Sequence, residues 1–383
     1  MNVAIIDAVR TPRGRARADG ALAGETPHGL VAHLARGIAA RGGDLGQVEG
    51  LTLGCVGQVG AQGGHLAVVA KLAIGLPETA TAHTLNNYCA AGLSAIGQAA
   101  AAIAAGQANT LLAGGVEMMS RVPFMSDAAD YYTAHDLGPT QRYIPVALAA
   151  DALASTWGIG SEALDAATLA SQTRAAAAEN IPALQASRLP LAGLTREENL
   201  RLLPAERLAA LLPAFGALAE EYSVALAGAR AEPRLTVAHA PPMADGAGLA
   251  LLTRADVAPA ARARIVGYAE SGGDARLSLT AGFAAMDKVL ARTRLTLGDI
   301  DRIEFMEAFA VVIARFLRDY PVDPERVNVS GGHLAKGHPM GATGAILLSA
   351  LLDTLDACDG RYGLVVVTGA SGVGAAMIVE RPL

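Results

Sequence analysis

The sequence predicts a layered α/β fold, in which buried strands alternate with helices. Short apolar runs such as residues 3–8, 51–56 and 110–115 are separated by longer stretches with helical spacing, which is the pattern of an α/β protein. The 383 residues are 52% hydrophobic and only 17% charged, so the chain is too apolar to be disordered. The 43 glycines and the 4% aromatic content indicate a core in which backbones approach closely.

Charge, cysteine count and hydropathy exclude several classes of protein. The formal net charge of −6 argues against a nucleic-acid binder, which usually carries a basic face. Three cysteines, Cys55, Cys89 and Cys358, are too few for a disulfide framework and favour a reducing compartment. The N-terminus does not have the pattern of a secretory signal, and the most apolar stretch, 90–115, is interrupted by Gln, Asn and Gly. We therefore expect a cytoplasmic protein without a membrane span.

Two apolar parts of the chain are expected to build the core. In the first part, strands are predicted at 3–8, 51–56 and 110–115, and helices at 29–40 and 93–105. In the second part, strands are predicted at 264–268, 302–305, 363–368 and 375–380, and helices at 281–292, 307–318 and 346–357. In each part a Gly-rich turn bears one reactive residue and precedes a helix of small residues. This likeness suggests a duplicated core with its chemistry at the junction.

The stretch between these parts has a different amino-acid composition. It contains Trp157, a cluster of tyrosines and many Arg and Glu residues, and an amphipathic helix is predicted at 164–178. We therefore divide the chain into an N-terminal half at 1–119, an inserted domain at 120–244 and a C-terminal half at 245–383.

Cys89 directly precedes the helix expected at 93–105. A helix N-terminus presents free N–H groups and the positive end of the dipole, which lower the pKa of a thiol and favour the thiolate. Cys89 is thus a candidate nucleophile, although a buried structural cysteine is the commoner fate of a lone cysteine. Cys55 and Cys358 lie within apolar runs and are interpreted as packing residues.

His338 is the second candidate for chemistry. Pro339 restricts the backbone beside it, and the neighbouring glycines allow a tight turn. A histidine held in this way can act as a general base or an oxyanion donor; an ordinary loop histidine is the alternative. Together with Cys89 from the other half it would form the usual pair for activating a thiol.

The Gly-rich segment 369–374 joins two predicted strands. Because no helix follows it, a dinucleotide-binding or phosphate-binding loop is disfavoured. A turn whose backbone N–H groups face the active site and a plain hairpin turn both remain open. No Cys/His cluster with the spacing of a metal site is present, so no metal is predicted.

Several dispersed motifs resemble the thiolase family over nearly the whole chain. The segment Asn-Asn-Tyr-Cys-Ala-Ala-Gly-Leu around Cys89 is similar to the nucleophile motif of the family, with Ala91 at the position of its usual serine. The closing block, 362–380, is most similar to the β-subunit of the fatty-acid-oxidation trifunctional complex. The other matching blocks lie at 5–12, 114–120, 245–247, 307–310 and 337–339.

The resemblance implies a thiolase fold, with two similar αβαβα halves and an inserted loop domain. Cys89 would take an acyl group from acyl-CoA or another acyl thioester, His338 would activate the thiol, and the backbone N–H groups of Cys89 and Ala370 would hold the oxyanion. Coenzyme A thioester is then a substrate, and no permanently bound cofactor is expected. The family also implies a homodimer or a dimer of dimers, and the small residues at 110–115 suit close pairing across such an interface.

Two positions depart from the catalytic pattern of the family. Thr368 stands where thiolases have a second cysteine, the base that moves the α-carbon proton, and the pKa of a threonine hydroxyl is too high for that role. Met306 stands where they have Asn or His, and its side chain has no hydrogen-bond donor. The candidates for a substitute group are His333, His239 and Glu307.

The expected contacts to CoA are also altered. Pro241 occupies the position of a serine that contacts the pantetheine arm, and Leu212 that of an arginine. Three readings follow: a thiolase-type acyltransferase, a diverged acyl transferase or thioester hydrolase without efficient Claisen chemistry, and a catalytically silent thiolase-like binding subunit. Retention of Cys89 and His338 favours the first two.

Overall fold

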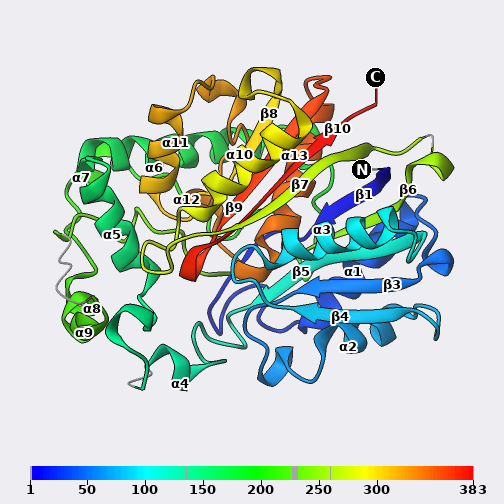
Figure 1. Cartoon of the computed structure of the whole chain (residues 1–383), viewed down its shortest axis with the longest axis horizontal. Helices are drawn as coiled ribbons and strands as arrows, with labels where there is room; N and C mark the ends of the chain where they lie inside the picture. Colours follow the sequence, from blue (N-terminus) through cyan, green and yellow to red (C-terminus); the bar gives the residue numbers. More distant parts are fainter. Residues whose placement is uncertain (1, 134–135, 227–231, 259, 383) are drawn as a thin grey trace.

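The computed structural model describes residues 2–133, 136–226, 232–258 and 260–382. Its strands form one mixed sheet in the order β4-β3-β5-β6-β1-β7-β10-β9-β8, with β2 paired to β6 (Figure 1). The α/β class predicted from the sequence is confirmed. The strands are β1 (Val3–Arg10), β2 (Gly14–Arg15), β3 (Gly50–Gly54), β4 (Thr81–Leu85), β5 (Thr110–Met118), β6 (Ala244–Arg254), β7 (Ala263–Gly272), β8 (Arg302–Phe305), β9 (Tyr362–Thr368) and β10 (Val373–Glu380).

Helices α1, α3, α6, α10, α11 and α13 begin and end within three residues of the predicted bounds. Among the described residues, the sequence did not predict α2 and α5 or the short helices α4, α7, α8, α9 and α12. The helices are α1 (Pro27–Ala40), α2 (Leu66–Ile74), α3 (Ala91–Ala104), α4 (Ala129–Tyr132), α5 (Val146–Thr156), α6 (Ser161–Ala178), α7 (Ala205–Ala209), α8 (Gly216–Glu221), α9 (Ser223–Leu226), α10 (Ala281–Thr293), α11 (Ala310–Asp319), α12 (His333–Lys336) and α13 (Thr343–Asp356).

Strands β1 and β7 pair over a short distance only, through Ala4 and Ile5 of β1. On one side of this junction lie β4, β3, β5 and β6, and on the other β10, β9 and β8. Strand β6 pairs with β5 and β1, so residues 244–254 belong with the strands of the first third of the chain. The division at 119/120 and 244/245 otherwise remains a prediction.

Helices α3 and α13 pack against each other, and glycines allow their first turns to touch. A Cβ atom on Gly92 would lie 2.6 Å from the Gly341 carbonyl oxygen, and one on Gly344 would lie 2.5 Å from the Leu93 nitrogen. Real Cβ atoms do not approach so closely, so only glycine fits at both positions. The residues that precede the two helices are thereby brought together.

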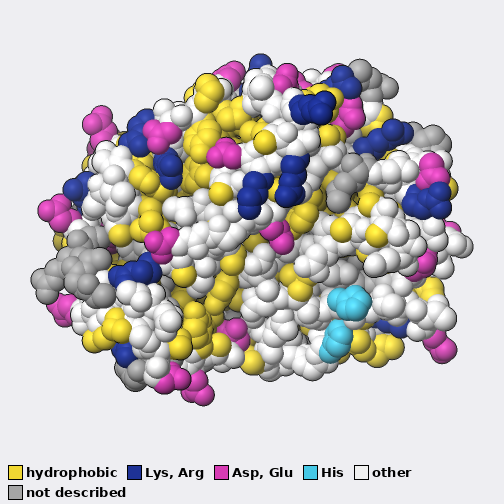
Figure 2. Space-filling model, viewed as in Figure 1, with side chains coloured by type: hydrophobic (Ala, Val, Ile, Leu, Met, Phe, Trp, Pro, Cys, Tyr) yellow, Lys and Arg dark blue, Asp and Glu magenta, His cyan; other side chains and the backbone are white. Residues whose placement is uncertain are grey.

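The inserted part of the chain, which contains α4 to α9, lies at one end of the molecule (Figure 1, left). On the face shown in Figure 2, hydrophobic side chains gather between this part and the body of the sheet. No helix within the described ranges is long and apolar enough to cross a membrane.

The strand predicted at 110–115 is not placed to pair with a second copy. It forms β5, whose two edges are already occupied by β3 and β6. Strand β4 lies at the end of the sheet, where its outer edge has no partner among the described strands. The sequence could not distinguish the two, because strand order depends on contacts distant in the chain.

Candidate active site

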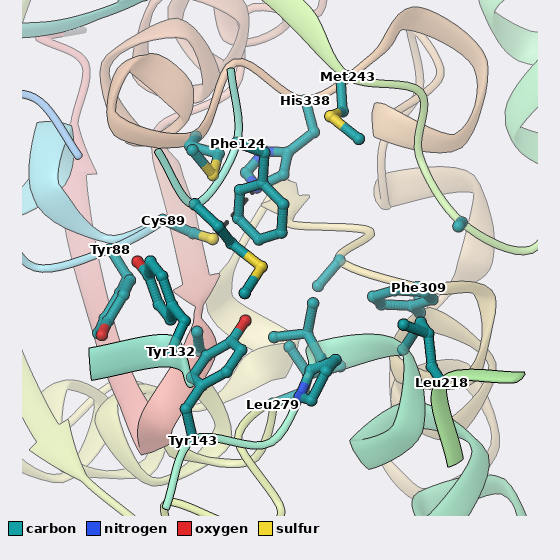
Figure 3. Close-up of a pocket in the computed structure, with 18 of the residues that line it drawn as sticks. Tyr88, Cys89, Phe124, Tyr132, Tyr143, Leu218, Met243, Leu279, Phe309 and His338 are labelled. Atoms are coloured by element: carbon teal, nitrogen blue, oxygen red, sulfur yellow. Dashed lines mark hydrogen bonds between the residues drawn. The ribbon is translucent and has the colours of Figure 1, made fainter. Parts of the chain in front are cut away.

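Cys89 and His338 meet at the N-terminal ends of α3 and α13. The Nε2 atom of His338 lies 3.1 Å from the Sγ atom of Cys89 (Figure 3). Only 9% of Cys89 is exposed. The structure therefore brings together the two residues that the sequence selected for thiol chemistry, within the distance needed for proton transfer.

The turn before Cys89 is held in an uncommon backbone conformation. Tyr88 has φ of 45°, in the left-handed region, which costs a non-glycine residue about 1–3 kcal/mol. The Tyr88 N–H donates to Asn86 Oδ1 at 2.9 Å, and Asn87 Nδ2 donates to Ser94 Oγ at 2.9 Å. These side chains support the strained turn and direct Cys89 into the site.

His338 is oriented by two contacts. Its Nδ1 atom lies 2.7 Å from Thr343 Oγ1, and its backbone N–H donates to the Pro242 carbonyl at 2.8 Å. A proton on Nδ1, donated to Thr343, leaves the lone pair of Nε2 directed at the thiol of Cys89. This is the geometry of a general base.

Burial keeps both partners of this pair uncharged. Desolvation raises the pKa of Cys89 to about 12, although the N–H groups of Ala370 and of Cys89 itself act against the rise. Desolvation, together with the positive charge of Arg13, lowers the pKa of His338 to about 3. The expected lowering of the thiol pKa at a helix N-terminus is therefore wrong, because burial outweighs the dipole. The thiolate arises only as the thiol proton moves to His338.

The turn after β9 lies against Cys89. A Cβ atom on Gly369 would lie 3.3 Å from the Cys89 Cβ, and the Ala370 N–H acts on the Cys89 sulfur. Ser371 has φ of 54°, which turns the chain back into β10. These contacts favour the interpretation of 369–374 as a turn that faces the site over a plain hairpin turn.

The two positions that depart from the family pattern lie differently with respect to the site. Met306 lines the cavity beside Cys89, where it offers no hydrogen-bond donor. Thr368 is fully buried and is not among the lining residues. Its Oγ1 accepts a hydrogen bond from the Gly282 N–H at 3.5 Å.

The candidate substitute bases do not line the cavity. His239 lies with Nε2 2.8 Å from Asp165 Oδ1 and accepts the Thr236 N–H on Nδ1. Both ring nitrogens are therefore occupied.

Glu307 is similarly engaged, because it accepts hydrogen bonds from Ser171 Oγ, Asn328 Nδ2 and the Leu334 N–H. His333 is fully buried, and its ring lies edge-on to that of His338 with centroids 5.5 Å apart. In the described part of the chain neither of its nitrogens has a hydrogen-bond partner.

Sequence reasoning missed the role of Glu117 as an anchor. This fully buried carboxylate accepts N–H bonds from Val56 at 2.9 Å, Gly57 at 3.0 Å and Gly341 at 3.1 Å, and one from Gln62 Nε2 at 2.7 Å. It thus ties the loop after β3 and the loop after His338 to β5. An acidic residue inside an apolar strand was the available signal.

A cavity of about 690 Å³ opens beside the pair, and its walls are mostly apolar. Pro241 lines it, whereas Leu212 is 81% exposed and does not. The residues that line it come from both halves and the inserted part, and include Met119, Phe124, Tyr132, Tyr143, Leu279, Phe309 and Met340. Phe124, Tyr132 and Tyr143 can be seen around Cys89 in Figure 3.

Comparisons with known proteins cover the whole chain. Residues 3–256 match the family model of the thiolase N-terminal domain, and residues 259–381 match that of the thiolase C-terminal domain. The chain is 34% identical to a steroid 3-ketoacyl-CoA thiolase of Mycobacterium tuberculosis, over 98% of this chain and 93% of that protein. It is 32% identical to a 3-ketoacyl-CoA thiolase of Vibrio vulnificus, over 100% of both.

Solved structures agree with these matches. The acetyl-CoA acetyltransferase of Bacillus anthracis superposes with a TM-score of 0.86 at 28% identity, covering 100% of this chain and 99% of that one. Human mitochondrial 3-ketoacyl-CoA thiolase gives a TM-score of 0.87 at 27% identity, with 100% and 99% coverage.

Proposed function

This chain belongs to the thiolase family of acyltransferases, and we propose that Cys89 is the residue that carries the acyl group and His338 the base that activates it. The acyl donor is an acyl-CoA or another acyl thioester. The observation that carries the proposal is the 3.1 Å contact between Cys89 Sγ and His338 Nε2 at the wall of an apolar cavity. An acyl group that packs against these apolar walls displaces water from them, which favours transfer over hydrolysis.

The acylation step follows from this geometry. As Cys89 Sγ attacks the thioester carbonyl carbon, its proton passes to His338 Nε2, and the carbonyl oxygen becomes an oxyanion. The N–H groups of Cys89 and Ala370 hold that oxygen. The bond from the carbonyl carbon to the CoA sulfur then breaks, the proton of His338 goes to the departing thiolate, and the acyl group remains on Cys89.

Intact mass spectrometry tests the acyl-enzyme. Wild-type protein incubated with acetyl-CoA or octanoyl-CoA should gain the mass of one acyl group. Cys89→Ala should gain none, whereas Cys358→Ala, which removes an exposed cysteine, should behave as wild type. No adduct on wild type with either donor would reject the proposal, and would favour a silent binding subunit.

A second candidate differs only in the acceptor of the acyl group. Met306 has no donor in the cavity, and Thr368 is not among its lining residues, which favours an acceptor other than an acetyl-CoA carbanion. Acetoacetyl-CoA with free CoA distinguishes the two. Rapid thiolysis to acetyl-CoA supports full thiolase chemistry, and acylation of Cys89 by acetyl-CoA without thiolysis supports a transferase to another nucleophile or to water.

We also propose that the protein forms a homodimer through the open edge of β4, with a dimer of dimers as the larger alternative. Helix α2 packs beside β4 and leaves Leu72 72% exposed and Val68 38% exposed, four residues apart on one face of the helix, where a second copy would cover both. Light scattering should give twice the monomer mass for wild type and a lower mass for Leu72→Asp. A cytoplasmic location remains an expectation, consistent with three free cysteines.

A further inference from the structure

One wall of the cavity beside Cys89 is built of tyrosines. The rings of Tyr132 and Tyr143 meet edge-on with centroids 4.7 Å apart, and Tyr222 packs on Tyr143 at 6.5 Å. Tyr132 and Tyr143 form one buried cluster with Ala370, whose N–H acts on the Cys89 sulfur. This wall therefore lies where it can contact an acyl group on Cys89.

The tyrosine hydroxyls in this wall differ in their partners. Those of Tyr88 and Tyr132 lie close enough to act on each other's pKa, and Ser371 acts on the pKa of Tyr88. For the hydroxyl of Tyr143, no hydrogen bond is found among the residues that the structure describes. Tyr143 is only 3% exposed, and Figure 3 shows its hydroxyl pointing into the cavity on the side of Cys89.

This hydroxyl is a hydrogen-bond donor in the range of neutral pH. Burial, with the neighbouring tyrosines, raises the pKa of Tyr143 above its ordinary value, so the phenol keeps its proton. The hydroxyl borders the cavity, where water can bond it, and a ligand that displaces this water leaves the phenol unpaired unless the ligand offers an acceptor. The natural partner is an acceptor atom on the molecule that fills the cavity.

The acyl carbonyl oxygen is not that acceptor, since the N–H groups of Cys89 and Ala370 are placed to hold it. The cavity of about 690 Å³ is in the range of sites that enclose a drug-sized ligand. An acetyl group would leave much of the surrounding surface of Met119, Phe124 and Leu279 without contact. The occupant is therefore larger, mainly apolar, and oxygenated at one further point.

Resting on the acyl-enzyme proposed above, we infer that this site selects bulky apolar acyl groups that carry a second oxygen, a hydroxyl or carbonyl, which accepts a hydrogen bond from Tyr143. Apolar contacts bind the body of the group. The hydroxyl of Tyr143 discriminates against an analogue of the same shape that lacks the oxygen, because the analogue displaces water from the phenol and leaves it unpaired.

Matched acyl donors test this inference. The probes are 3-phenylpropanoyl-CoA and its three isomers with a hydroxyl at ring position 2, 3 or 4. The rate constant for acylation of Cys89 is measured by mass spectrometry for each probe. At least one isomer should acylate wild type about tenfold faster than the parent compound, as one hydrogen bond allows.

The variant Tyr143→Phe removes only the hydroxyl, and should reduce that preference to about twofold or less. Tyr320→Phe, a matched change outside the cavity, should retain the full preference. Thermal melting checks that both variants fold.

Equal or faster acylation by the parent compound in wild type would overturn the inference, as would a preference that persists in Tyr143→Phe. Octanoyl-CoA serves as the reference donor. If it acylates Cys89 while no hydroxyl preference is seen, the inference about Tyr143 fails alone; if nothing acylates Cys89, the acyl-enzyme proposal fails with it.

Discussion

The Nε2 atom of His338 lies 3.1 Å from the Sγ atom of Cys89, although 249 residues separate them in the chain. The contact exists because the first turns of α3 and α13 touch through Gly92 and Gly344. Two helix ends from different parts of the chain thus form the pair for which we propose catalysis. The geometry of this pair depends on backbone packing more than on the two side chains themselves.

Substitutions at these glycines should disturb the pair. Gly92→Ala and Gly344→Ala force α3 and α13 apart, so the rate of Cys89 acylation should fall by a factor of about 10². The free energy of unfolding should fall by about 1–3 kcal/mol through overpacking. Stopped-flow acylation and urea denaturation measure the two effects.

Gly24→Ala is the matched control, since a Cβ atom there has nothing within 4 Å. It should change stability by less than about 0.5 kcal/mol and leave acylation unchanged. Wild-type acylation rates in both Gly92→Ala and Gly344→Ala would show that the contact between the helices does not set the geometry of the pair.

The neutral state of the pair predicts an unusual pH dependence. With the pKa of Cys89 raised to about 12 and that of His338 lowered to about 3, neither group titrates between about pH 6 and about pH 9. Alkylation of Cys89 by iodoacetamide, followed by peptide mass spectrometry, should therefore be nearly independent of pH in this range.

His338→Gln removes the internal base, so the thiolate must form by loss of the proton to solvent. Alkylation should then be slower at neutral pH and rise about tenfold per pH unit. Alkylation of the exposed Cys358, measured in the same digest, is the control for the reactivity of iodoacetamide at each pH. If the alkylation rate of Cys89 in wild type instead rose as a sigmoid centred at about pH 8, Cys89 would titrate as an ordinary thiol.

Glu117 should support both stability and acylation. Glu117→Gln replaces one acceptor oxygen with an NH₂ group that faces the N–H donors of Val56, Gly57 or Gly341. At least one buried donor then lacks a partner, and we expect a loss of about 2–4 kcal/mol in the free energy of unfolding. Because Gly341 lies close after His338, acylation should also slow in the folded variant. Unchanged denaturant midpoints would contradict the anchoring role.

The environment of Asp353 predicts how the free energy of unfolding depends on pH. Its carboxylate accepts hydrogen bonds from Arg10 at 2.7 Å, Arg262 at 2.8 Å and Ser187 Oγ at 2.6 Å. Burial acts to raise the pKa of Asp353, but the charges of Arg10 and Arg262 outweigh it, and the pKa lies below its ordinary value. The stability from this ionised group is therefore present above about pH 4 and is lost as the pH falls through the folded-state pKa.

Asp353→Asn should cost about 3–5 kcal/mol at neutral pH, because the buried arginines lose their counter-charge. The difference in the free energy of unfolding between wild type and Asp353→Asn should become smaller as the pH falls below about 4, since the wild-type carboxyl group is then protonated. Urea titrations at several pH values measure this difference. A difference that stays constant on acidification would exclude the ionic contribution.

The sequence by itself determined the fold class and indicated the two residues for which we propose the chemistry. Alternation of buried strands with helices is a local pattern, and Cys89 and His338 lie in local motifs of glycine and small residues. The positions of helices α1, α3, α6, α10, α11 and α13 and of most strands followed from the same periodicity. Strand β6 did not, because its opening Ala-Asp-Gly-Ala-Gly has no alternation and is buried on both faces.

Only the tertiary structure decided the state and surroundings of these residues. The direction of the thiol pKa shift was wrong from the sequence, because desolvation depends on neighbours brought in from distant segments. For the same reason the order of the strands, the anchoring by Glu117 and the position of the Tyr143 hydroxyl at the cavity could not be foreseen. A local pattern selects residue types and backbone shapes, whereas burial, charge and hydrogen-bond partners are set by the packing of segments that lie far apart in the chain.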